Sequence, residues 1–241
     1  MGIQRRNARS AVLAKQRSAR LRVPRRIEFT RRSSNSPERL TEGRRVPQAA
    51  RRIQRDMSET TELSPLIFDR WSPRGFSDRP IDPGTLRSLF EAARWAASCF
   101  NEQPWRFVVA EKSDPAAFER ILGTLVPQNQ AWAKTAWALA ISAGKKTFTH
   151  NGAPDRFGLH DAGAALANLM IQATAIGLYV HAMGGFDAAK ARAEFGIPED
   201  FEVGAAFAIG YLGEGQVPGE RTRRALADQA FGVEWGKAYF S

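Results

Sequence analysis

The chain has 241 residues, 43% of them hydrophobic, with 35 Lys or Arg, 25 Asp or Glu and one Cys. This length suits one sizeable domain, alone or with an arm. A single thiol, Cys99, excludes an intramolecular disulfide framework and a zinc site built from cysteines. Residues 1–56 hold 17 of the basic and 4 of the acidic residues, a net charge of +13. Residues 57–241 carry −3, which gives the whole chain its net charge of +10. The basic character therefore belongs to an arm, and the body is slightly acidic.

The arm, residues 1–56, repeats arginine pairs among Ser, Pro and Asn without a sustained apolar period. We expect it to be disordered, because it buries too little apolar surface to offset its ordering entropy. Three interpretations stay open: a misassigned start with the natural protein beginning at Met57, a targeting arm, or an electrostatic tether to nucleic acid or anionic membrane. No apolar segment follows the charges, so no secretory signal is predicted.

Residues 57–241 are expected to form one domain of helices and strands, an α/β domain. Asp82 and Pro83 are typical of a helix start, and the apolar residues that follow at helical spacing place one face of that helix on the core. The expected elements, in chain order, are a helix from Asp82, a strand over 105–110, a helix over 114–125, a buried strand over 136–142, a long helix over 159–178, a helix from Asp187 to Gly196, and a strand over 203–211.

The long helix over 159–178 is apolar on most sides, which indicates a buried or interface helix. Its length, about 20 residues, would cross a bilayer, but the cost of placing His160, Asp161, Asn168 and Gln172 in lipid argues against a membrane span. We assign His160 and Asp161 to capping the start of this helix. The tail after it spaces four aromatic residues that we expect to cover another surface: Phe231, Trp235, Tyr239 and Phe240.

Several common chemistries lack their motifs in this sequence. It has no glycine-rich dinucleotide fingerprint and no nucleophile elbow. The three histidines, His150, His160 and His181, lack metal-ligand spacing. Acyl transfer, phosphoryl transfer and metal-dependent hydrolysis are therefore unsupported, and no metal is predicted. A reaction whose difficult step is carried by a bound cofactor needs none of these motifs.

Two polar segments carry the candidate chemistry. If extended, Arg70-Trp71-Ser72-Pro73-Arg74 places two guanidiniums and a hydroxyl on one side, which suits a phosphate; a solvated basic segment is the alternative. The loop Ala97–Trp105 brings the amides of Asn101 and Gln103 together, and amides can both donate to and accept from a heterocycle. The alternative for this loop is an Asx-type turn in which Pro104 sets the strand entry.

Together with later segments, these two resemble the nitroreductase family of FMN-dependent oxidoreductases, over about residues 66–236. The later segments are Asn129-Gln130-Ala131-Trp132, His160-Asp161-Ala162-Gly163-Ala164-Ala165, Met183-Gly184-Gly185-Phe186-Asp187 and Arg221-Thr222-Arg223-Arg224. The resemblance implies an α+β fold, a central and mostly antiparallel sheet flanked by helices, in an intertwined homodimer with two FMN sites at the subunit interface. It also implies a cytoplasmic protein, away from the membrane, that meets nucleic acid only through the arm.

The resemblance also implies residue roles. Contacts to the FMN phosphate and ribityl chain fall to Arg70, Ser72 and Arg74, and the loop that reads the flavin ring and ribityl chain from the partner subunit comprises Ser98, Cys99, Asn101 and Gln103. The side-chain amide of Asn129 is expected to hydrogen-bond the flavin. The segment near the reactive N5 comprises Met183, Gly184 and Gly185, and the basic pair of the tail comprises Arg221 and Arg223.

Two positions depart from the family pattern. Cys99 stands where relatives often have serine, and Gly184 where many have an acidic residue, which leaves the substrate open. His181 precedes this second segment, and two roles are open for it: a structural hydrogen bond or donation to a substrate oxygen.

The mechanism implied by the resemblance needs no catalytic residue of the protein. NAD(P)H gives a hydride to the flavin and leaves, and an electron-poor small molecule then takes the electrons in the same place, as in ping-pong kinetics. Such acceptors include nitroaromatics, quinones and activated alkenes or imines. Two alternatives remain: an FMN enzyme of the same fold that performs reductive dehalogenation, azoline oxidation or flavin fragmentation, and a basic-armed dimer that binds nucleic acid.

Overall fold

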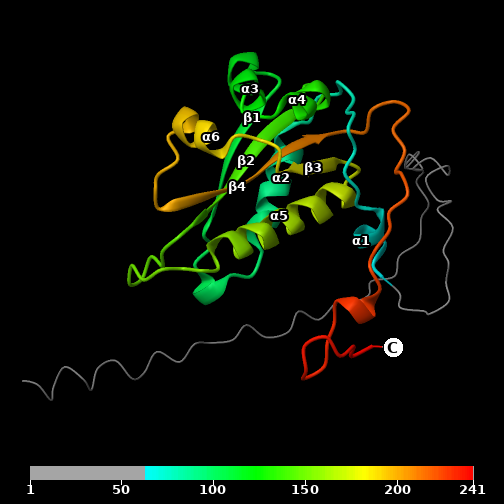
Figure 1. Ribbon diagram of the computed structural model, residues 1–241. Helices are drawn as coiled ribbons and strands as arrows, with labels where there is room; N and C mark the ends of the chain where they lie inside the picture. The colour runs from blue at the N-terminus through cyan, green and yellow to red at the C-terminus, as the bar shows by residue number, and fades with distance from the viewer. Residues whose placement is uncertain (1–62, 241) are drawn as a thin grey trace, which may run out of the picture. The chain divides into compact units, whose positions relative to one another are not determined.

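The computed structural model describes residues 63–240, and its centre is a four-stranded antiparallel sheet (Figure 1). The predicted disordered arm lies outside the described residues. The strands lie in the order β1-β2-β4-β3, so β1 and β3 are the edges. Their bounds are β1 (Trp105–Glu111), β2 (Ala138–Lys145), β3 (Tyr179–Met183) and β4 (Phe201–Gly210). Every neighbouring pair is antiparallel, so the α+β architecture implied by the resemblance is confirmed.

Helices cover both faces of this sheet. The bounds of the helices are α1 (Pro65–Asp69), α2 (Pro83–Arg94), α3 (Pro115–Leu122), α4 (Pro127–Ala133), α5 (Gly158–Ala175) and α6 (Ala188–Phe195), with short 3₁₀ turns η2 (Cys99–Asn101) and η3 (Leu226–Asp228). α2 and α5 pack together on one face, whereas α3, α4 and α6 contribute to the core of the other. The central strand β2 is therefore buried along almost its whole length, as its short apolar run predicts.

The sheet sends alternate residues into these two cores. Ala138 and Ala140 of β2 pack with α2 and α5, whereas Leu139 and Ile141 pack on the opposite face. This follows from the two-residue period of a strand. Phe207, with no exposed surface, is the largest fully buried side chain. The two cores hold β3 and the start of α5 in fixed positions, and the candidate site is built on both.

Capping residues set the helix starts that the sequence predicts. The Asp82 side chain accepts the Thr85 N–H at 2.9 Å, Asp114 accepts from Ala117 at 3.1 Å, and Asp187 accepts from Lys190 at 2.8 Å. α6 ends at Gly196, which has a left-handed φ of 60° that glycine adopts without steric cost. These three predicted helix starts are confirmed.

Other boundaries differ from the predictions. The helix expected over 114–125 ends at Leu122, because Thr124 and Leu125 turn back onto the previous turn. The helix expected over 159–178 ends at Ala175, and Leu178 enters the core. Three elements were not predicted from the sequence: α1, α4 and β3. Within residues 63–240, no helix combines the length and apolar character needed to cross a bilayer.

Candidate functional site

Arginines from the two ends of the described chain meet beside α1. The guanidinium of Arg221 donates to the carbonyl oxygen of Arg70 at 2.9 Å and lies over the Phe68 ring. The pKa of Arg70 is lowered, first by partial burial and then by the nearby charges of Arg221 and Arg223. We call Arg70, Arg221 and Arg223 the arginine cluster. The resemblance implied a phosphate contact at Arg70 and a basic pair at Arg221 and Arg223, and the structure brings these residues together.

The positive charge of this cluster is not offset by the part of the chain that the structure describes. No ion pair among residues 63–240 includes Arg70, Arg221, Arg223 or Arg74. Ser72 and Arg74 are exposed on the same segment, and the Arg70 guanidinium approaches the Ser72 hydroxyl at 3.5 Å. Like charges held together this way are stabilised by a bound anion, and guanidinium forks match phosphate oxygens. The group therefore fits the phosphate of FMN.

His181 on β3 fixes the segment that carries Ser72 and Arg74. Its Nδ1 lies 2.8 Å from the carbonyl oxygen of Pro73, and its ring stacks on Trp132 of α4 at 4.4 Å. Burial, followed by the charge of Arg74, lowers the pKa of His181. Because a carbonyl oxygen can only accept, the ring donates Nδ1–H to Pro73. Of the two roles open for His181, the structure shows the structural hydrogen bond.

The end of β3 leads to a backbone segment that α4 holds in place. Asn129 donates from its side-chain amide to the carbonyl oxygen of Gly185 at 3.0 Å, and the Val126 N–H donates to the same oxygen at 3.1 Å. A Cβ at Gly185 would lie 2.7 Å from the Asn129 amide nitrogen, so a side chain there would displace that amide. Gly184 is exposed with open space around it, whereas the Met183 side chain is buried. A planar ring can therefore approach the backbone at Gly184.

The loop over 98–103 has an unusual backbone. Phe100, Asn101 and Gln103 have φ values of 52°, 56° and 52°, in the left-handed region that favours glycine. The Ser98 hydroxyl accepts the Gln103 N–H at 3.0 Å, and the Gln103 amide donates to the carbonyl of Asn101 at 3.2 Å. Such a conformation costs about 1–3 kcal/mol per residue and clusters at functional sites. The four loop residues predicted to read the flavin lie in or beside this strained backbone.

Asp161 anchors this loop to α5. Its buried carboxylate accepts the backbone N–H of Cys99 at 2.8 Å and lies 2.8 Å from Nδ1 of His160. The prediction that His160 and Asp161 cap the helix is wrong: Phe157 is the N-cap, without a side-chain bond, and Asp161 points to the 98–103 loop. Sequence reasoning missed this role because the bonded groups are 62 residues apart.

The predicted site residues thus form two groups in one chain. The first group joins the arginine cluster beside α1 to Asn129 of α4 and the 183–185 segment, because His181 of β3 bonds Pro73 of the arginine-bearing segment and stacks on Trp132 of α4. The second group is the 98–103 loop at the start of α5. In Figure 1, α1 lies beside the end of α5, far from its first turn. A helix of 18 residues is about 27 Å long. Within a single chain, the structure does not bring the two groups together.

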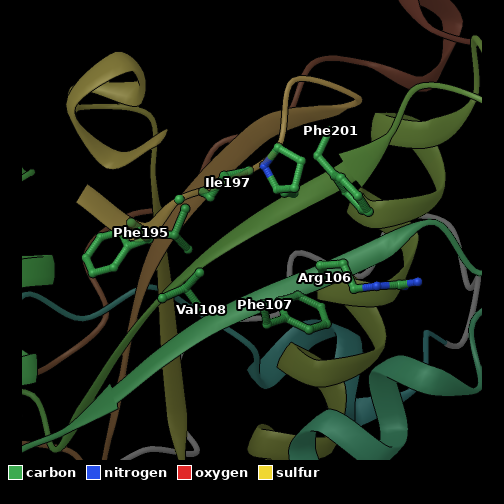
Figure 2. A pocket seen from close by; sticks show the side chains of 10 residues that line it. Arg106, Phe107, Val108, Phe195, Ile197 and Phe201 are labelled. Carbon is green, nitrogen blue, oxygen red and sulfur yellow. The ribbon is translucent and has the colours of Figure 1, made fainter. Parts of the chain in front are cut away.

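A pocket of about 160 Å³ lies elsewhere, over β1, β2 and the turn after α6 (Figure 2). Its wall includes Phe107, Phe195 and Phe201, and the guanidinium of Arg106 lies 5.7 Å from the Phe201 ring. None of the predicted site residues lines it. Its volume is below the roughly 300 Å³ typical of small-molecule sites, and it lacks a convergent set of polar groups. The candidate site is therefore the two groups described above.

Comparison with known proteins agrees with the geometry. A family model described as "Nitroreductase family" matches residues 67–211. The chain belongs to the nitroreductase family. This membership confirms the resemblance drawn from the motifs and, at the level of the family, the expectation of an FMN-dependent NAD(P)H oxidoreductase.

Individual proteins similar to this chain are named as nitroreductases or as FMN-containing oxidoreductases. A predicted NADH dehydrogenase/NAD(P)H nitroreductase from Archaeoglobus fulgidus is 30% identical over 159 residues, covering 62% of this chain and 85% of its own. The crystal structure of an oxidoreductase containing FMN is 36% identical, with a TM-score of 0.67, covering 73% of this chain and 94% of that one. A nitroreductase from Desulfovibrio desulfuricans in complex with FMN, 22% identical with a TM-score of 0.59, shares the fold over 72% of this chain and 99% of its own.

Proposed function

We propose that this protein uses NAD(P)H to reduce electron-poor small molecules, such as nitroaromatics or quinones, by a ping-pong mechanism. It is an FMN-dependent oxidoreductase of the nitroreductase family. The observation that carries the proposal is the arginine cluster, whose charges have no acidic partner among residues 63–240. Such a cluster can bind the phosphate of FMN by charge pairing.

The residues of the chain divide the work of holding FMN. We assign Arg70, Arg221 and Arg223, with Ser72 and Arg74, to the phosphate and the adjoining chain. Met183–Gly185 provides backbone that the ring can approach. The Asn129 side chain keeps the Gly185 carbonyl in place, and we assign its amide a hydrogen bond to the flavin as well. Ser98, Cys99, Asn101 and Gln103 contact the ring from the strained loop.

When bound, FMN would accept a hydride from NAD(P)H and pass two electrons to the second substrate. The protein contributes position and charge. Backbone at Gly184, with no side chain, leaves the ring face accessible to both substrates in turn. The positive cluster favours negative charge on the bound cofactor.

We also propose a homodimer in which the 98–103 loop of one subunit completes the site begun by the arginine cluster of the other. The separation of the two groups along α5 supports this arrangement, because one cofactor cannot reach both within a chain. Exposed apolar side chains in the tail support it as well: Trp235 is 91% exposed and Tyr239 is 69% exposed. A partner surface would remove them from water.

Residues 57–241 form the FMN-binding domain, and the arm, residues 1–56, contributes nothing to the reaction. A cytoplasmic location agrees with a reaction that consumes NAD(P)H. A truncated protein starting at Met57 is expected to keep the cofactor and the activity of the full chain, and loss of either would show that the arm has a role.

The decisive experiment is a visible spectrum of the purified full-length protein before and after anaerobic addition of NADH or NADPH. We expect flavin absorbance that bleaches with the reductant and returns when a quinone is added. Initial rates at several fixed quinone concentrations are expected to give parallel double-reciprocal lines. A protein that stays colourless with added FMN would refute the proposal, and intersecting lines would refute the shared site.

A further inference from the structure

Three aromatic rings gather at the surface beside the strained loop. The ring centroids of Phe100, Phe148 and His150 lie 5.5 to 5.7 Å from one another. We call these three residues the aromatic triad. The Phe100 side chain is 80% exposed, and His150 is exposed as well. A phenyl ring in water forgoes the free energy of burial, and Phe100 also has a left-handed backbone. Two unfavourable features at one residue indicate a surface kept for binding.

The triad is assembled from two loops. Phe100 belongs to the 98–103 loop, whereas Phe148 and His150 belong to the turn between β2 and α5, seen in Figure 1 at the same end of the fold as the start of α5. That turn has its own hydrogen bonds: the Phe148 N–H donates to Ala153 at 2.9 Å, and the Gly152 N–H donates back to Phe148 at 2.8 Å. The rings of this turn are therefore held by a defined backbone.

Glu102 joins the two loops. Its carboxylate accepts the Thr149 N–H at 2.9 Å and also the Thr149 hydroxyl. The Lys145 ammonium lies 3.7 Å from the same carboxylate and donates to the Thr149 hydroxyl at 2.7 Å. Glu102 stands between Asn101 and Gln103, the two amides assigned to the flavin. The triad is thus fixed relative to the loop that reads the cofactor.

We propose that the aromatic triad is the surface on which the ring of the oxidising substrate stacks, and that it selects planar, electron-poor aromatic acceptors. This inference rests on the proposed function, because it places the triad beside the bound flavin. The face of a phenyl ring carries negative charge density, so an electron-poor ring stacks on it favourably. The His150 imidazole adds an N–H that can donate to a nitro or quinone oxygen.

The test compares two acceptors in the full-length holoenzyme. 1,4-Naphthoquinone is planar and aromatic, whereas ferricyanide accepts electrons without a ring to stack. The variant is Phe100→Leu with Phe148→Leu, which keeps apolar bulk and removes both ring faces. Phe100→Ala with Phe148→Ala is the second variant. Trp95→Ala is the matched control, because Trp95 is 78% exposed but lies outside the triad.

We expect the ratio of kcat/KM for naphthoquinone to kcat/KM for ferricyanide to fall about tenfold in both double variants, through a higher KM for the quinone. The control should keep the wild-type ratio. An unchanged ratio in the double variants would overturn the inference. Loss of FMN absorbance would overturn it in favour of cofactor binding, and dissociation of the oligomer in light scattering would assign the triad to a subunit interface.

The same assay separates this inference from the proposed function. If the wild-type protein reduces both acceptors with NAD(P)H and the ratio does not change, only the triad assignment fails. If the wild-type protein reduces neither acceptor, the proposed function fails and the triad assignment falls with it.

Glu102 provides a second test, as a positioning residue. Glu102→Ala removes the acceptor for Thr149 and should lower the acceptor ratio in the same direction as the triad variants. Glu102→Gln keeps a carbonyl oxygen for the Thr149 N–H and should restore most of the wild-type ratio. Equal ratios in the two variants would show that the join between the loops does not position the triad.

Discussion

The arginine cluster and the 98–103 loop differ in how they are stabilised when no ligand is bound. Around the cluster, Arg70, Arg221 and Arg223 repel one another, and burial lowers the pKa of Arg70, so a bound anion would stabilise this region. The loop instead satisfies its groups internally, through Ser98 and the buried carboxylate of Asp161. One region depends on its ligand for stabilisation, and the other is preorganised before any ligand binds. Substitutions in the two regions should therefore have different signatures.

The largest expected effect is on cofactor affinity at the cluster. Replacing Arg70 and Arg223 with Ala removes two charge-assisted bonds to the phosphate, each about 1.5–3 kcal/mol. FMN affinity, measured by quenching of its fluorescence, should fall on the order of 10²- to 10⁴-fold. The unfolding free energy of the cofactor-free protein should not fall, since a repulsion is relieved. Arg87→Ala on α2 is the control, and equal FMN affinity in the two proteins would show that the cluster does not hold the phosphate.

Asp161→Ala should have the reverse signature. It leaves the Cys99 N–H without its acceptor, so the cofactor-free protein should lose about 2 kcal/mol in urea denaturation. Asp161→Asn keeps a carbonyl oxygen for that N–H and should lose less. If Asp161→Ala leaves the unfolding free energy unchanged, the loop is not held from α5 and its preorganisation has another source.

Two adjacent glycines test how α4 holds the backbone after β3. Gly185→Ala places a Cβ against the Asn129 amide, which should break the bond to the Gly185 carbonyl and cost about 1 kcal/mol. Gly184→Ala meets open space and should leave the thermal unfolding of the cofactor-free protein unchanged. Equal melting temperatures for the two variants would contradict this packing of Gly185 against Asn129.

The smallest effects are in pH dependence, and the two regions should respond in different ranges. The lowered pKa of His181 means that the unfolded chain takes up its proton first, so stability falls as pH drops below about 6.5. The lowered pKa of Glu102, caused mainly by its bonds to Thr149, stabilises the fold above about pH 4.3, and this contribution is lost as pH falls through the folded value.

Thermal unfolding followed across pH would separate these two contributions. His181→Asn should flatten the slope between neutral pH and pH 5 only, and Glu102→Gln should flatten the slope in the acidic range only. A variant that changes both ranges would show that the two regions are energetically coupled.

Local signals in the sequence predict local structure well here. Three helix starts could be predicted because a capping carboxylate bonds a backbone N–H three residues later, at Asp82, Asp114 and Asp187. α4 begins at Pro127 without a side-chain cap, and the five-residue strand β3 is too short for a convincing period, so both were missed. The motif around Arg70 is contiguous and could be recognised.

Partners far apart in the chain could not be predicted. The bond from Arg221 to Arg70 joins residues 151 apart, and the bond from Thr149 to Glu102 joins residues 47 apart. Nothing local in the sequence distinguishes a carboxylate that caps a helix from one that anchors a remote loop, which is why Asp161 was misassigned. Family resemblance supplied the site residues, but the groups that hold them emerged only from the fold.

The length of α5 has a genetic consequence under the proposed dimer. One allele lacking the arginine cluster and another lacking the 98–103 loop would each encode an inactive enzyme. Co-expressed, they would form mixed dimers in which one of the two sites draws the intact cluster from one subunit and the intact loop from the other. Two null alleles would then complement each other, and random pairing would restore about a quarter of the wild-type sites.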